Sequence, residues 1–190
     1  MIPPNRKAFL DMIAVSEGTS TSPATQDNGY DIIVTGVDGT PEIFTDYREH
    51  PFAGGRKSKL INHKGLTSNA SGRYQFMLRD WYHYKALLHL PDFGPDSQDQ
   101  WALQLIRERQ ALPLIDLGQF ATAVQRVSNI WRACPALGMG SMRTNWRRCR
   151  VCTRTLGEQW RDPLLDQGTG TWTDSGGARR RVPSSRHQPD

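Results

Sequence analysis

The sequence of 190 residues lacks any run of 18 consecutive apolar residues, and polar side chains interrupt its first residues every few positions. These two absences exclude a membrane-spanning helix and the apolar stretch of a signal peptide. We therefore expect a protein that is made in the cytoplasm, carries no export signal and is not inserted stably in a membrane. The sequence also lacks an internal repeat and is too short for two domains of full size, but its 37% of hydrophobic residues can form a core.

Cysteine is scarce, because the three cysteines all lie between residues 134 and 152. Cys149 and Cys152 have the CxxC spacing, but no second pair and no histidine pair accompanies them, which disfavours a zinc or redox site. The five histidines show no ligand spacing. The sequence thus predicts no metal and no cofactor.

Net charge is absent from the first two thirds of the chain. Residues 1–132 contain 14 basic and 14 acidic residues, whereas residues 133–190 contain 10 arginines, no lysine and 5 acidic residues, which supply the whole net charge of +5. A charge confined to a tail rich in glycine, serine and arginine says little about the main domain, so we predict no nucleic-acid partner.

Apolar residues recur at helical spacing in four places, over residues 5–16, 73–88, 96–109 and 119–132. Two extended segments, residues 30–34 and 43–45, flank a turn and predict a small hairpin, and residues 50–64 read as a loop. The pattern favours an α+β fold that is mostly helical with a small β-hairpin lobe. Periodicity ends after residue 132, which predicts a disordered or poorly packed tail.

The tripeptide Ser16-Glu17-Gly18 places a carboxylate in the last turn of the first helix, where the helix dipole disfavours a negative charge. Burial at the edge of the core would raise the pKa of Glu17 and keep its carboxyl protonated near neutrality, as a general acid requires. The alternative is an exposed glutamate at a helix end with no catalytic role.

Five segments, in this order and at these separations, resemble the endolysins of lambdoid phages: FLDMIAVSEGT, NGYDIIVTG, FTDYREHP, SGRYQF and AVQRVSNIW. The resemblance covers residues 5–132 and implies a lysozyme-like fold with a catalytic glutamate that matches Glu17. It also implies lytic transglycosylase activity, in which the β-1,4 bond between N-acetylmuramic acid and N-acetylglucosamine of peptidoglycan is cut without water and leaves a 1,6-anhydromuramic end.

In such a reaction Glu17 would act first as the acid and then as the base. A hydrolytic lysozyme would need a second carboxylate, for which Asp27, Asp31 and Asp46 are the candidates, and the pairing of Glu17 with Asp27 stays open as the alternative. Tyrosine rings can stack on sugars, and polar side chains can bind N-acetyl groups. Residues of these kinds in the matching segments are therefore the expected substrate contacts. These expected substrate-binding residues are Tyr30, Asp31, Tyr47, Tyr74, Gln75 and Asn129, and Tyr74 reads equally well as a core residue.

The resemblance further implies that the partners are peptidoglycan glycan strands and that a holin pore releases the protein. We expect a monomer that stays in the host cytoplasm until lysis and then reaches the periplasm.

The family pattern breaks abruptly after Trp131, where a segment such as LPGAGYGQ is expected. A set of codons that encodes residues 134–143 can be chosen so that the same bases, read in a frame that begins one base earlier, encode LPGAGYGQYE. We therefore hypothesise a frameshift, which divides the chain into a lysozyme-like domain truncated at its C-terminal end, residues 1–132, and an out-of-frame tail, residues 133–190. An inactive prophage remnant is the third alternative.

Overall fold

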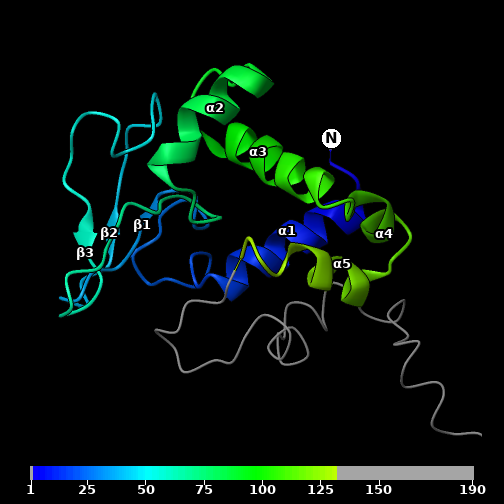
Figure 1. The fold of residues 1–190 in the computed structure, drawn as a ribbon, viewed down its shortest axis with the longest axis horizontal. Helices are drawn as coiled ribbons and strands as arrows, with labels where there is room; N and C mark the ends of the chain where they lie inside the picture. The colour runs from blue at the N-terminus through cyan, green and yellow to red at the C-terminus, as the bar shows by residue number, and fades with distance from the viewer. Residues whose placement is uncertain (1, 132–190) are drawn as a thin grey trace, which may run out of the picture. The chain divides into compact units, whose positions relative to one another are not determined.

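The computed structural model describes residues 2–131, so the predictions for residues 133–190 lie outside the described part of the chain. The described residues form five helices and two short strand pairs (Figure 1). The elements are α1 (Pro4–Ser16), β1 (Ile32–Ile33), β2 (Glu42–Ile43), β3 (Lys59–Leu60), β4 (Thr67–Ser68), α2 (Leu78–Leu88), α3 (Pro95–Glu108), α4 (Leu112–Asp116) and α5 (Phe120–Val127). This confirms the predicted α+β class with its small β-hairpin lobe.

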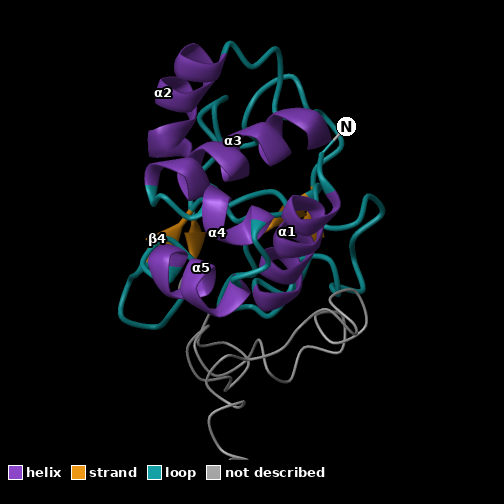
Figure 2. Cartoon of the chain, turned by 90° about the vertical axis from the view of Figure 1, so that its right-hand side faces the viewer, coloured by secondary structure: helices purple, strands orange, loops and turns teal. Residues whose placement is uncertain are grey.

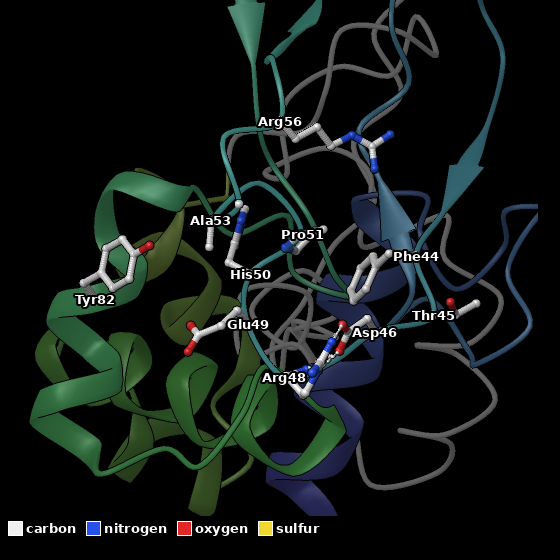
Figure 3. Close-up of a pocket in the computed structure, with 11 residues that line it drawn as sticks. Phe44, Thr45, Asp46, Arg48, Glu49, His50, Pro51, Ala53, Arg56 and Tyr82 are labelled. Carbon is white, nitrogen blue, oxygen red and sulfur yellow. Dashed lines mark hydrogen bonds and ion pairs between the residues drawn. The ribbon is translucent and has the colours of Figure 1, made fainter.

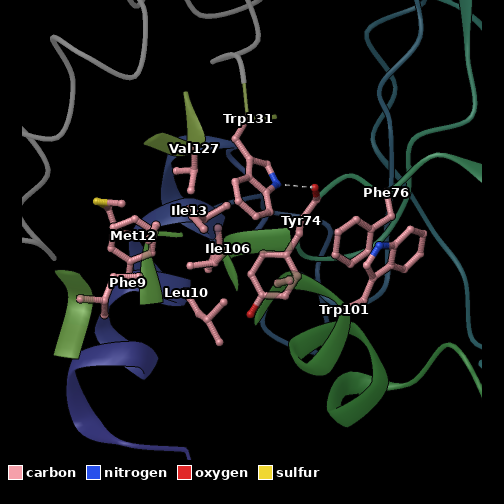
Figure 4. Close-up of a cluster of buried hydrophobic side chains, with 14 of the residues drawn as sticks. Phe9, Leu10, Met12, Ile13, Tyr74, Phe76, Trp101, Ile106, Val127 and Trp131 are labelled. Carbon is pink, nitrogen blue, oxygen red and sulfur yellow. Dashed lines mark hydrogen bonds between the residues drawn. The ribbon is translucent and has the colours of Figure 1, made fainter. Parts of the chain in front are cut away.

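The core joins the N-terminal helix to the C-terminal helices. Helix α1 packs against α4, and α4 packs against α5, which Figure 2 shows as neighbouring helices. Phe9 of α1 stacks on Phe120 of α5, and Figure 4 shows Ile13 and Ile106 in the same cluster. Each large apolar side chain buried in this way contributes about 1.5–3 kcal/mol. None of the helices within residues 2–131 is long and apolar enough to cross a membrane.

The two strand pairs are short and antiparallel. Strands β1 and β2 form the predicted hairpin, with Ile32 opposite Ile43. Strands β3 and β4 pair Lys59 with Ser68, whereas the sequence pattern over residues 50–64 predicts a loop. Leu60 is exposed, so this hairpin has no apolar face that a hydrophobic pattern could reveal. The side chain of Asn62 closes its turn by accepting the backbone N–H groups of Lys64 and Leu66.

The second predicted helix begins later than expected, at Leu78 rather than at residue 73. Ser71 and Phe76 exchange backbone hydrogen bonds of 2.9 and 2.8 Å, which makes residues 71–76 a tight turn. Gly72 has a φ of +78°, and a Cβ there would lie 2.2 Å from Oε1 of Gln98. A tertiary contact with α3 therefore overrides the local helical pattern. The last predicted helix also ends early, at Val127, and α4 was not predicted.

His50 is a buried titratable group beneath this turn, with 1% of its surface exposed. Its Nε2 lies 3.1 Å from the carbonyl oxygen of Phe76, and its Nδ1 accepts the backbone N–H of Phe52 at 3.3 Å. The bond from Phe52 fixes the neutral tautomer that donates to Phe76. Burial lowers the pKa of His50 to about 4.

The lowered pKa predicts that His50 destabilises the fold in acid. Between a pH of about 6.5 and 4 the unfolded chain binds a proton that the folded chain excludes, so stability falls as pH falls, by up to about 3 kcal/mol. Denaturant unfolding at pH 7 and pH 4 should show a larger loss for the parent than for His50→Gln. Equal losses in the two proteins would contradict this account.

Candidate active site

Glu17 stands at the C-terminal end of α1, held by a glycine-dependent cap. Gly18 has a φ of +74° and its N–H donates to the carbonyl of Val15 at 3.1 Å. The N–H of Thr19 donates to the carbonyl of Ala14, also at 3.1 Å. These two bonds form a Schellman motif. The residue that ends the helix in this motif has a positive φ, and glycine is strongly preferred there. The Ser-Glu-Gly sequence thus ends a helix of the core and fixes the backbone of Glu17.

Thr19 connects this helix end to the tight turn of residues 71–76. Its side chain is buried, and its hydroxyl donates to the carbonyl oxygen of Arg73 at 2.7 Å. The guanidinium of Arg73, itself buried, donates to Oδ1 of Asp11 on α1 at 2.6 Å. The turn is therefore tied to α1 both at the middle of the helix and beside Glu17.

A groove with a volume of about 660 Å³ opens at Glu17, and the Oε1 atom of this residue is buried. We call this hollow the Glu17 groove. Its walls come from the β3–β4 hairpin, the turn before α2, helices α2 and α3, and the segment after α5. They include Glu17, Val34, Ile61, Leu66, Thr67, Ser68, Ala70, Tyr74, Gln75, Phe76, Met77, Arg79, Asp80, Tyr84, Trp101, Leu105, Arg109, Asn129, Ile130 and Trp131.

The structure brings four of the predicted site residues together on this groove, namely Glu17, Tyr74, Gln75 and Asn129. Gln75 has a φ of +54°, and its side-chain amide donates to the carbonyl of Gly72 at 3.1 Å. Asn129 is exposed and lies in the segment after α5. A glutamic acid, two amide side chains and an aromatic floor form a surface suited to sugars with N-acetyl groups.

Tyr74 is both groove wall and core. Only 1% of its surface is exposed, and Figure 4 shows its ring beside Phe76 and Trp101. Its hydroxyl donates to Oδ1 of Asp99 at 2.5 Å, and its carbonyl oxygen accepts the indole N–H of Trp131 at 3.1 Å. Burial raises the pKa of the Asp99 carboxyl, although its tyrosine partners oppose that shift. The position supports the core interpretation of Tyr74, while a sugar contact stays a prediction.

Three other predicted substrate-binding residues lie away from the groove lining. The hydroxyl of Tyr30 donates to Oδ1 of Asp99 at 2.9 Å, and that of Tyr47 donates to Oδ2 of Asp27 at 2.7 Å. Asp31 is buried and accepts the hydroxyl of Thr25 at 2.5 Å. These bonds hold the loop between α1 and β1, so a direct role of the three residues toward sugars stays a prediction.

Most residues of the groove wall were not predicted from the sequence. Asp80 lies on this wall and is the second carboxylate of the lining, beside Glu17. Its carboxylate pairs with Arg79 at 3.3 Å. Helical periodicity could have placed Asp80 and Tyr84 on one face of α2, four residues apart. No local signal marks Leu66 or Arg109, because the groove is assembled from distant segments.

A second hollow, of about 830 Å³, lies between the chain after β2 and helix α2 (Figure 3). Arg48 holds the pKa of Asp46 down at about 2. Glu49 accepts the indole N–H of Trp81 at 2.7 Å and pairs with Lys85, which lowers its pKa. Both acids are therefore ionised at neutral pH, and neither suits a general acid. Within residues 2–131 no group of three side chains is arranged to hold a metal ion.

In comparison with known proteins, the model of the endolysin family matches residues 7–159 of this chain. The chain belongs to the endolysin family. The endolysin of Escherichia phage P2 is 52% identical over 153 residues, which are 80% of this chain and 93% of that protein. The endolysin of Escherichia phage lambda is 50% identical over 136 residues, which are 71% of this chain and 80% of that protein.

Solved structures place this endolysin among lysozymes. The lysozyme of bacteriophage lambda aligns with a TM-score of 0.67 and 43% identity, over 82% of this chain and 94% of that one. The same lysozyme complexed with a chitohexasaccharide aligns with a TM-score of 0.67 and 44% identity, over the same shares. The lysozyme-like fold expected from the sequence is thereby confirmed, and the protein is an enzyme of the endolysin and lysozyme type.

The family match extends to residue 159 and so runs past residue 132, where the resemblance of the five segments ends. Residues 132–159 lie outside the described part of the endolysin. The frameshift hypothesis therefore stays a prediction.

Proposed function

We propose that this endolysin cleaves the β-1,4 bond between N-acetylmuramic acid and N-acetylglucosamine of peptidoglycan as a lytic transglycosylase. The observation that carries the proposal is the position of Glu17 on the groove, while Asp27, Asp31 and Asp46 lie off its lining. The chitohexasaccharide complex of the lambda lysozyme supports a glycan as the occupant of the groove.

The reaction needs one carboxyl group that changes role. The Glu17 carboxyl gives its proton to the glycosidic oxygen as the bond from that oxygen to C1 of the muramic acid breaks. The C6 hydroxyl of the same sugar then forms a bond to C1, and its proton returns to the Glu17 carboxylate. The products are a free N-acetylglucosamine end and a 1,6-anhydromuramic end, and no water is consumed.

Hydrolysis would require a carboxylate that activates water or forms a glycosyl intermediate at roughly 5–9.5 Å from the acid. Asp80 is the other carboxylate of the groove lining, and its half-buried side chain pairs with Arg79. Mass spectrometry of murein digested by the full chain separates the two reactions. Anhydro ends support the transglycosylase, reducing muramic ends support a hydrolytic lysozyme, and undigested murein supports an inactive remnant.

Asp27→Asn should retain cleavage within a few-fold of the parent rate. The asparagine oxygen can still accept the hydroxyl of Tyr47, so the loop should keep its structure, and the proposed reaction has no water to activate. Initial rates on purified murein measure the effect. A loss as large as that of Glu17→Gln would instead assign Asp27 to a two-carboxylate hydrolase.

We further propose that the endolysin acts as a monomer on glycan strands, stays in the host cytoplasm until lysis and reaches the periplasm through a holin pore. Size-exclusion chromatography with light scattering tests the first part, and lysis timing in cells with and without holin tests the second.

A further inference from the structure

Two arginines beside the Glu17 groove have no acidic partner among the described residues. Of the eight arginines within residues 2–131, five form ion pairs with aspartate or glutamate: Arg6, Arg48, Arg56, Arg73 and Arg79. Arg107, Arg109 and Arg126 form no such pair among the described residues, and Arg107 instead bonds Gln104. Arg109 and Arg126 come from different helix ends, yet they line the same hollow.

This hollow has a volume of about 320 Å³, and we call it the arginine hollow. It shares Arg109 and Asn129 with the Glu17 groove, so the two cavities adjoin along these residues. Its lining is polar throughout and consists of Glu108, Arg109, Gln110, Gln125, Arg126, Ser128 and Asn129.

The one acidic residue of the arginine hollow is already engaged elsewhere. Oε2 of Glu108 accepts the hydroxyl of Tyr84 at 3.0 Å, and its Oε1 accepts the side-chain amide of Gln104 at 3.0 Å. Neither oxygen bonds Arg109 or Arg126. Arg109 and Arg126 therefore line a polar hollow that holds two cations and one carboxylate, and neither arginine forms an ion pair with a residue within 2–131.

We propose that the arginine hollow is a subsite for the carboxylates of the peptidoglycan stem peptide. The inference rests on the proposed function, because it takes the glycan strand in the Glu17 groove as its starting point. Stem peptides branch from the muramic acid and carry free carboxylates, and guanidinium groups bind carboxylates through paired, charge-assisted hydrogen bonds. The amides of Gln110, Gln125 and Asn129 suit the peptide backbone that connects these carboxylates to the sugar.

Helix dipoles offer a second reason for these cations. Arg109 follows the last residue of α3, and Arg126 lies in the last turn of α5, where positive charge stabilises a helix. Arg107 has the same dipole environment as Arg109 but lines none of the three hollows. If the dipole were their only role, replacing Arg107 and replacing Arg109 should affect binding equally. A stem-peptide subsite predicts that replacing Arg109 weakens binding and replacing Arg107 does not.

The test measures binding without turnover, in the full chain carrying Glu17→Gln. Its dissociation constant is measured by sedimentation with purified murein sacculi and with sacculi whose carboxyl groups have been converted to amides. Arg109→Gln with Arg126→Gln should weaken binding to native sacculi about tenfold and leave binding to amidated sacculi unchanged. The control pair, Lys57→Gln with Arg107→Gln, removes the same charge from positions outside the hollows and should leave both constants unchanged.

Any of these results would overturn the inference: equal weakening on both kinds of sacculi, equal weakening by the control pair, or no weakening by the arginine pair on native sacculi. The inference would also be overturned if the Glu17→Gln chain that keeps both Arg109 and Arg126 did not bind native sacculi. The chemistry of Glu17 is judged separately from the ends that the unsubstituted chain produces. Anhydro ends without a binding effect would reject the subsite alone, and a binding effect with reducing ends would reject only the transglycosylase reaction.

Discussion

Glu17→Gln is expected to reduce the rate of murein cleavage by a factor of about 10²–10⁴, the usual contribution of a general acid. Glutamine keeps the size of the side chain and its ability to accept hydrogen bonds, but it has no proton to give to the glycosidic oxygen. The cap that holds this position uses the backbone of Gly18 and Thr19, so the fold should persist. Cleavage is measured by the clearing of a murein suspension, and folding by thermal unfolding.

Glu49→Gln is the matched control for this substitution. It makes the same change from carboxyl to amide in the second hollow, where Glu49 pairs with Lys85 on the surface, and it should leave cleavage near the parent rate. Residual activity of Glu17→Gln within a few-fold of the parent would remove this residue from the mechanism. Equal losses in the two variants would show that the effect is not specific to the Glu17 carboxyl.

The catalytic end of α1 could be predicted because its signals are local. Pro4 at the first turn, apolar residues at helical spacing and Gly18 directly after the helix all lie within fifteen residues of one another. The cap bonds of Gly18 and Thr19 reach only to Val15 and Ala14. Such short-range encoding specifies where Glu17 stands before any tertiary contact is known.

The tight turn of residues 71–76 could not be predicted in the same way. Its conformation depends on Gln98, whose side-chain oxygen accepts the N–H of Arg73 at 2.8 Å and whose amide donates to the carbonyl of Tyr30 at 3.0 Å. These partners lie 25 and 68 residues away in the sequence. Local propensity favours a helix there, and the long-range bonds outweigh it.

The predicted sugar-stacking tyrosines show a related limit. An aromatic residue in a matching segment indicates a packing surface, but the sequence does not show where its hydroxyl goes. Asp99 accepts both Tyr30 and Tyr74, and this convergence of two segments on α3 appears only in three dimensions. Gln75 and Asn129 could be predicted as groove residues because each is a polar side chain, able to bond an N-acetyl group, within a segment that matches the family.

Arg73→Met is expected to destabilise the fold by about 3 kcal/mol, near the lower end of the cost of breaking a buried ion pair. The Arg73 side chain is 3% exposed, and it donates to Asp11 at 2.6 Å and to the carbonyl of Asn28 while lying 5.0 Å from the ring centre of Tyr30. Methionine fills much of the volume but leaves the carbonyl without its donor. Asp11 is partly exposed and keeps Lys7, which limits the loss.

Arg6→Met provides the comparison, because Arg6 of α1 is likewise paired with an aspartate, Asp116. Its bonds to Asp116 at 2.8 and 2.7 Å have good geometry but are exposed, so its removal should cost at most about 1 kcal/mol. Thermal unfolding should show a fall of about 10 °C for Arg73→Met and a few degrees at most for Arg6→Met. Cleavage by Arg73→Met should also fall at temperatures where it stays folded, since the lost guanidinium ties the turn that carries Gln75 to Asp11 of α1. Equal stability losses in the two variants would show that burial adds nothing to the Arg73 pair.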